Sequence, residues 1–172
     1  MNFGFESIMM RKLLCSVLLL TAALPALADT PYLEVFLGQV DLGRPQADSQ
    51  YGLQFQSGWR LTRYDLIPMA GVMRTRYGSH YLYAGLGRVT PFSAREGGLS
   101  LALSFAPGLY WHGGNADTDL GYPVQFQSSV GIHYDFPDAT RIGLHFSHLS
   151  NASLADTNPG TEALTLRYGV PF

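Results

Sequence analysis

Hydrophobic residues alternate with small or polar residues along most of the chain after about residue 30. The alternation is clearest at residues 99–111, which read LSLALSFAPGLYW. Successive residues of a β-strand point to opposite faces, so a period of two predicts strands with one apolar face. Eight strands are predicted in this way, at residues 31–40, 51–62, 66–74, 80–90, 99–111, 124–136, 141–150 and 162–172.

The first and second strands differ in how well their faces are defined. At residues 31–40 both faces are apolar, since Tyr32 and Phe36 alternate with Leu33 and Val35, and the facing stays open. Residues 51–62 carry one apolar stripe that is predicted to run on to the tryptophan and leucine near its end. Three connections are long and polar, at residues 42–50, 112–121 and 151–161.

Two fold classes fit eight alternating strands. A water-soluble barrel or sandwich would bury the apolar face, and a transmembrane barrel would turn it to lipid. Strands of about 9–11 residues cross a bilayer when tilted, and the last strand ends on the aromatic Phe172, as outer-membrane barrels commonly do. We therefore predict an all-β fold, an eight-stranded antiparallel transmembrane β-barrel of the outer membrane.

The N-terminal segment carries the pattern of a secretory signal peptide. Arg11 and Lys12 precede an apolar run at 13–20, and Ala26-Leu27-Ala28 matches an A-x-A cleavage site. We predict a signal peptide at 1–28 and a single barrel domain at 29–172.

The composition of residues 29–172 excludes several function classes. This segment has no cysteine, so disulfides and thiolate metal sites are excluded. Nine arginines, no lysine and twelve acidic residues give a net charge of −3, which does not indicate nucleic-acid binding. No run of 18 apolar residues occurs, which excludes a helical membrane span.

The C-terminal hairpin places three chemically active residues on its apolar face. In residues 141–150 the stripe that contains the isoleucine, leucine and phenylalanine continues to His148 and Ser150, and in 162–172 it begins at Glu162. With Ser150 roughly opposite Glu162, His148 would lie diagonal to the glutamate, at about 7–8 Å. With both termini periplasmic, the connection between these strands lies outside, and the three residues lie near the outer-leaflet rim.

This group of residues suits acyl transfer to water. A serine hydroxyl is a poor nucleophile until a base takes its proton, and histidine, with an ordinary pKa near 6.5, is the usual base. A carboxylate orients the imidazole and stabilises the imidazolium that forms. The sequence therefore predicts an esterase whose substrate ester lies at the boundary between headgroups and acyl chains.

The same segment resembles a known family. The pattern His148-x-Ser150-Asn151-Ala152, followed by NPGTE at 158–162 and an aromatic-ended strand, is similar to the lipid A 3-O-deacylase family (PagL type). The resemblance implies an eight-stranded outer-membrane barrel that removes the 3-position acyl chain of lipid A. It also implies a catalytic triad in which the serine is two residues after the histidine and the glutamate twelve after the serine, as in this chain.

The resemblance also implies supporting residues. Asn151, Ala152, Ser153, Asn158 and Gly160 would build or brace an oxyanion hole, with backbone N–H groups just after the serine and the side chain of Asn158 as its parts. Glycine is expected at position 153 in the family, and this chain has serine. The implied partner is lipid A of lipopolysaccharide in the outer leaflet, and a homodimer stays open. Nothing in the sequence indicates a cofactor or a metal.

Three alternatives remain open. A small outer-membrane barrel can be structural or adhesive without being an enzyme. A lipid-facing site can also belong to a phospholipase or acyltransferase. Inside the barrel, His133, Asp135 and His145 share one face, which fits either a metal site or polar side chains that fill the lumen.

Overall fold

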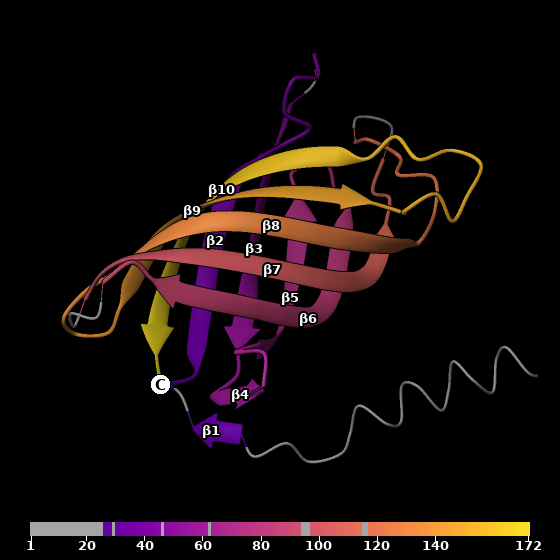
Figure 1. The fold of residues 1–172 in the computed structure, drawn as a ribbon. Helices are drawn as coiled ribbons and strands as arrows, with labels where there is room; N and C mark the ends of the chain where they lie inside the picture. The colour runs from indigo at the N-terminus through magenta and orange to yellow at the C-terminus, as the bar shows by residue number, and fades with distance from the viewer. Residues whose placement is uncertain (1–25, 29, 46, 62, 94–96, 115–116) are drawn as a thin grey trace, which may run out of the picture.

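Eight antiparallel strands close into a barrel in the order β10-β2-β3-β5-β6-β7-β8-β9 (Figure 1). The computed structural model describes residues 26–28, 30–45, 47–61, 63–93, 97–114 and 117–172. The barrel strands are β2 Tyr32–Val40, β3 Asp48–Gln56, β5 Ile67–Thr75, β6 His80–Pro91, β7 Gly98–Trp111, β8 Val124–Asp135, β9 Arg141–Ser150 and β10 Thr161–Pro171. The predicted fold class is thus confirmed. None of the described residues forms a helix long and apolar enough to cross a membrane.

The strand predicted at 51–62 is wrong in its extent. β3 ends at Gln56, and a separate short strand, β4 (Trp59–Leu61), pairs outside the barrel with β1 (Ala26–Ala28). The alternation fails at Ser57, which is buried directly after the buried Gln56, and its hydroxyl accepts the Trp59 N–H at 3.2 Å. The chain therefore turns at Ser57, and Trp59 does not continue the outward stripe of β3.

Most of the predicted signal peptide lies outside the described residues. Residues 1–25 and Asp29 are not described, and only β1 falls within the predicted peptide. The boundary after Ala28 stays a prediction, and cleavage there would remove β1 from its pairing with β4.

The facing of β2, which the sequence leaves open, is decided by one charged residue. Glu34 is buried in the lumen, where it pairs with Arg167 at 3.4 Å and accepts a hydrogen bond from Gln54 at 3.2 Å. A buried carboxylate is stable only when it is paired and hydrogen-bonded. Leu33 and Val35 are therefore turned outward, where they are exposed with the other large apolar side chains.

The interior histidines pair with each other. His133 Nε2 lies 2.5 Å from His145 Nε2, and His145 Nδ1 lies 3.1 Å from the Ser129 hydroxyl. Asp135 is occupied elsewhere, since it pairs with Arg141 at 3.1 Å and accepts from the Ser100 hydroxyl. Among the residues that the structure describes, no group of three or more His, Cys, Asp or Glu could hold a metal ion.

The connections after β2, β7 and β9 lie at one end of the barrel, away from the C-terminus (Figure 1). They define the loop end of the barrel. The connection from β5 to β6 is at the same end and is short, because the Thr75 N–H donates to the Ser79 carbonyl and the Gly78 N–H to the Thr75 carbonyl. This is the end at which β9 finishes and β10 begins, so it carries the three residues predicted to react.

Candidate active site on the outer face of the barrel

His148 and Glu162 form a hydrogen-bonded pair on the outward face of the barrel. The two residues are direct partners across β9 and β10, and His148 Nδ1 lies 3.0 Å from Glu162 Oε1. The predicted register, with Ser150 opposite Glu162, is therefore wrong by two residues. A two-residue offset leaves every side chain on the same face, so the prediction that these residues share a surface still holds.

Ser150 is the last residue of β9 and follows His148 on the same face. Its partner across β8 is Phe126. Within the described part of the chain, no hydrogen bond joins the Ser150 hydroxyl to His148, and His148 Nε2 has no partner. Hydrogen bonds between a nucleophile and its base are often long in ligand-free enzymes and tighten when substrate binds. Glu162 thus contacts Nδ1, and Nε2 is the ring nitrogen of His148 that could accept a proton.

Asn151 fixes the chain directly after the serine. Its side chain is fully buried and donates to the Leu120 carbonyl at 3.0 Å and to the Thr157 carbonyl at 2.8 Å. Its backbone N–H donates to the Asn158 side chain at 3.0 Å. Asn158 therefore braces the backbone of the residue after the serine, and the Leu120 carbonyl holds the side chain of the same residue.

The next two residues form a tight turn. Ala152 and Ser153 have φ of 53° and 61°, and the Leu154 N–H donates to the Asn151 carbonyl at 3.0 Å. Two central residues with positive φ are typical of a type I′ turn, which favours glycine, and Ser153 is where the resemblance led us to expect one. Among the described residues, none accepts a hydrogen bond from the Ala152 or Ser153 N–H. Both donors are free to bind an anion.

Gly160 allows the histidine to sit against the backbone. It has a φ of 58°, and a Cβ at this position would lie 3.0 Å from His148 Cε1. Its carbonyl accepts a hydrogen bond of 2.5 Å from Arg44, which also donates to the Pro159 carbonyl and to the Thr118 hydroxyl. The arginine thus joins the connections after β2, β7 and β9. Sequence reasoning missed Arg44, because nothing in a polar loop indicates which distant carbonyls it will reach.

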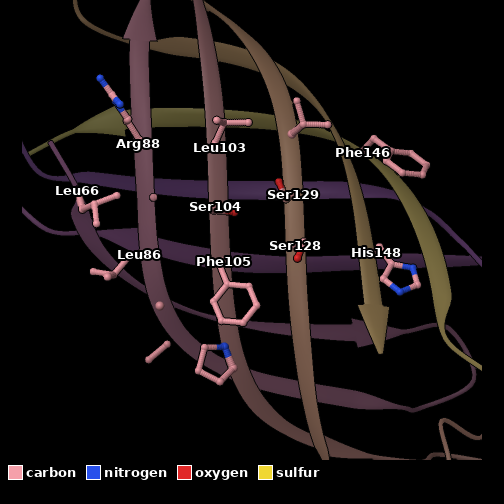
Figure 2. Close-up of a pocket in the computed structure, with 15 residues that line it drawn as sticks. Leu66, Leu86, Arg88, Leu103, Ser104, Phe105, Ser128, Ser129, Phe146 and His148 are labelled. Atoms are coloured by element: carbon pink, nitrogen blue, oxygen red, sulfur yellow. The ribbon is translucent and has the colours of Figure 1, made fainter. Parts of the chain in front are cut away.

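An apolar groove of about 850 Å³ starts at His148 and crosses the outer face of the barrel (Figure 2). Two rows of side chains, each in register across β6, β7, β8 and β9, form its walls, and small residues of the row between them form its floor. One wall consists of Leu86, Phe105, Ser128 and His148, the other of Arg88, Leu103, Val130 and Phe146, and the floor of Gly87, Ser104 and Ser129.

The groove extends well away from the pair. Leu66 and Arg88 lie at the far end from His148 (Figure 2). Three steps between neighbouring strands separate β9 from β6, which is a distance of about 14 Å. The small floor residues are visible in the sequence, but only the strand register shows that they line up.

The chain matches a family model described as lipid A 3-O-deacylase (PagL) over residues 46–171. Lipid A deacylase PagL from Bordetella bronchiseptica is 37% identical over 57 residues, which are 33% of this chain and 32% of that protein. The chain thus aligns with about a third of the length of this curated relative.

Two solved structures share the fold. The crystal structure of the outer membrane enzyme PagL has a TM-score of 0.68 and 21% identity, over 82% of this chain and 99% of that one. A structure from the de novo design of transmembrane β-barrels has a TM-score of 0.55 and 11% identity, over 84% and 98%. Because the family model matches well over half of the sequence, the chain belongs to the lipid A 3-O-deacylase (PagL) family of outer-membrane β-barrels.

Proposed function

We propose that the protein is an esterase that hydrolyses the 3-position ester-linked acyl chain of lipid A. Ser150 is the nucleophile, His148 the general base and then the general acid, and Glu162 the residue that orients the imidazole. The observation that carries this proposal is the His148–Glu162 hydrogen bond of 3.0 Å on the outward face, with Ser150 on the same face two residues away.

The orientation in the membrane follows from the connections. Outer-membrane barrels have short turns at the periplasmic side and longer loops outside, so the loop end faces outward. Ser150 and Glu162 border the connection after β9 and then lie at the outer-leaflet rim. A charged side chain that faces lipid destabilises the barrel by about 2–4 kcal/mol at the bilayer midplane and by much less near an interface. This favours a position of Glu162 near the outer interface.

The first step forms an acyl-enzyme. Ser150 Oγ attacks the ester carbonyl while His148 Nε2 takes the hydroxyl proton, and Glu162 stabilises the imidazolium through Nδ1. The oxyanion that develops accepts hydrogen bonds from the free N–H groups of Ala152 and Ser153. The imidazolium then returns the proton to the sugar oxygen, which leaves as an alcohol.

The second step regenerates the serine. A water molecule gives a proton to His148 and its oxygen attacks the acyl carbonyl, after which the proton passes to Ser150 Oγ. The products are a free 3-hydroxy fatty acid and a lipid A with one chain fewer. All of the residues involved come from one chain, so this chemistry needs no second copy.

The groove supports a substrate with a long apolar chain. It starts at His148 and is bordered along both sides by side chains such as Phe105 and Phe146. An acyl chain laid in it would place its ester beside the histidine. The Ser129 side chain is turned into the lumen, where its hydroxyl contacts His145, so the chain would contact mainly hydrocarbon.

The test is mass spectrometry of lipid A after incubation with the detergent-refolded protein and with its Ser150→Ala variant. We expect the wild type alone to remove one 3-hydroxyacyl unit, because alanine has no nucleophile. The rate should fall by about 10³-fold or more in the variant, as for other serine hydrolases that lose their nucleophile.

The same assay separates the alternatives. Unchanged lipid A from a folded wild-type protein would contradict the proposal and favour a structural barrel. Fatty acid released from glycerophospholipid but not from lipid A would indicate a phospholipase, and a gain of an acyl chain by the acceptor would indicate an acyltransferase. Equal activity of the wild type and the alanine variant would exclude Ser150 as the nucleophile.

A further inference from the structure

A second apolar groove lies on the outer face across β2, β3 and β5. It has a volume of about 380 Å³. Two rows of outward side chains in register form its walls, and the backbone of the row between them forms its floor. One wall consists of Leu37, Tyr51 and Arg74, the other of Val35, Leu53 and Val72, and the floor of Phe36, Gly52 and Met73.

This groove ends at an exposed arginine, Arg74. Arg74 is exposed and lies one residue before the end of β5, at the loop end of the barrel. Within the described part of the chain it has no ion pair or hydrogen bond from its side chain. By contrast, Arg88, also turned outward, pairs with Asp65 at 3.5 Å, and the interior Arg167 pairs with Glu34.

An unpaired arginine on a lipid-facing surface requires an anion or water. A lone cation is tolerated near the interface, where lipid headgroups supply negative charge. Arg76 is two residues further on and is exposed, with its guanidinium 5.7 Å from the Tyr77 ring. The two arginines place positive charge on the exposed surface of this part of the loop end, and an apolar groove leads away from it.

The position is remote from the proposed active site. In the closed order of eight strands, β5 lies four strands from β9 in either direction. A molecule bound at Arg74 therefore faces the opposite side of the barrel from His148 and cannot be the one whose ester reacts.

We propose that this surface binds a second molecule of lipid A, with a phosphate on Arg74 and an acyl chain in the groove. The ligand must be both anionic at its head and apolar in its chain, because the site has both features. The proposal rests on the membrane orientation proposed above, in which the loop end lies in the outer leaflet. Lipid A is the phosphorylated amphiphile of that leaflet.

The experiment counts bound lipids by native mass spectrometry in a Ser150→Ala background, in which substrate is not consumed. The probe is purified lipid A with both phosphates. We expect two lipids per barrel at saturation, and one after the further change Arg74→Gln, with the affinity for the second lipid weakened at least tenfold. Arg74→Lys should keep the second lipid, since a point charge can still bind phosphate.

Controls separate this site from ordinary lipid contact. Arg63→Gln removes an exposed arginine that stacks on Tyr64, in the connection before β5 at the other end, and should leave two lipids bound. Lipid A without phosphates should bind at the second site of the Arg74 protein as weakly as phosphorylated lipid A binds at that site in the Arg74→Gln protein. Retention of two lipids by Arg74→Gln, or equal binding of phosphate-free lipid A or of phosphatidylglycerol, would overturn the proposal.

This result is independent of the proposed reaction. Arg74→Gln alone, with Ser150 intact, should deacylate lipid A at the wild-type rate. If lipid A is not deacylated but one bound lipid still depends on Arg74, only the esterase proposal is rejected. Normal deacylation with no such lipid would reject only this inference.

Discussion

Two histidines on the same strand have opposite environments. His145 faces the lumen and is 5% exposed, and both of its ring nitrogens are occupied, by Ser129 and by His133. His148 faces outward and its side chain is 47% exposed, and among the described residues only its Nδ1 has a partner, Glu162. A separation of three residues puts the two side chains on opposite faces of the strand. Because His148 lies on the outer face, away from the polar side chains of the lumen, its Nε2 stays free in the part of the chain that the structure describes.

The comparison shows how a histidine that fills the lumen differs from the one proposed as the general base. Both histidines have a hydrogen-bond partner, and the sequence of the strand alone does not distinguish their roles. A general base needs one nitrogen held by an orienting group and the other free for a proton. Only the outward histidine meets this condition, so the sharpest tests exchange or remove groups at the two positions.

The largest effect is expected from removing each histidine in turn. His148→Asn should lower the deacylation rate by about 10²–10⁴-fold, the range for loss of a general acid–base, without changing the temperature at which the barrel unfolds. His145→Asn should keep most of the activity but lower the unfolding temperature, because Ser129 and His133 lose a buried partner at a cost of about 1–3 kcal/mol.

These outcomes can be read from two measurements, the initial rate on lipid A and the temperature at which the folded band shifts on SDS gels. A folded His145→Asn protein that has lost its activity would contradict the division of roles. So would a His148→Asn protein that retains activity.

A smaller effect is expected at the acid. Glu162→Gln keeps an oxygen near His148 Nδ1 but removes the charge that stabilises the imidazolium. We expect the rate to fall by about 10²-fold, less than the ~10⁴-fold loss at buried triad acids, because Glu162 is 40% exposed and water screens its charge. The measurement is kcat/KM on lipid A at neutral pH.

A matched variant tests whether any acid in the region would give this effect. Asp156 is exposed in the same connection, and Asp156→Asn should leave the rate unchanged. Equal losses in the two variants would mean that general surface charge, rather than the pairing with His148, is responsible.

The sequence predicts the faces of this site better than its contacts. Alternation over 141–150 and over 162–172 predicts that His148, Ser150 and Glu162 share one surface, and they do. The register across β9 and β10 came out two residues off, because the pattern repeats every two residues and a shift of two leaves it unchanged. The strand break at Ser57 was missed because Trp59 and Leu61 continue the alternation in sequence while the backbone turns away.

Long-range supports could not be predicted at all. Arg44 reaches the Gly160 carbonyl across more than a hundred residues of sequence, and Asn151 reaches the Leu120 carbonyl. Such contacts depend on how three connections meet at the loop end, and no local pattern encodes them. The grooves depend in the same way on registers between strands.

A further test probes how closely His148 is held. Gly160→Ala adds a Cβ that would lie 3.0 Å from His148 Cε1, at a φ of 58° that favours glycine. We expect the imidazole to shift and the rate to fall by about tenfold, which corresponds to about 1.4 kcal/mol. Gly43 is the control, since it has a φ of 79° and nothing within 4 Å of an added Cβ.

Gly43→Ala has a similar backbone strain but leaves the histidine in place. It should lower the unfolding temperature slightly and leave kcat unchanged. If both alanine variants lowered kcat equally, strain at the loop end rather than contact with His148 would explain the loss.

The smallest effect on activity is expected at Asp117, in the connection that carries Leu120. Burial acts to raise the pKa of its carboxyl, but hydrogen bonds from Ser79 and Thr75 outweigh it and hold the pKa below the ordinary value. A group with a lowered pKa stabilises the fold above its unfolded pKa, about 3.9 for aspartate, and this stability is lost as the pH falls through the folded pKa.

Asp117→Asn should therefore lower the unfolding temperature at pH 7, and the difference from wild type should shrink as the pH is lowered below about 4. The rate on lipid A should change less than for Gly160→Ala, because this loop acts on the site indirectly, through the Leu120–Asn151 and Thr118–Arg44 hydrogen bonds. A difference in unfolding temperature that is the same at pH 7 and at pH 3 would show that the asparagine acts through packing. In that case the packing of the Asp117 side chain, and not its negative charge, would stabilise this loop.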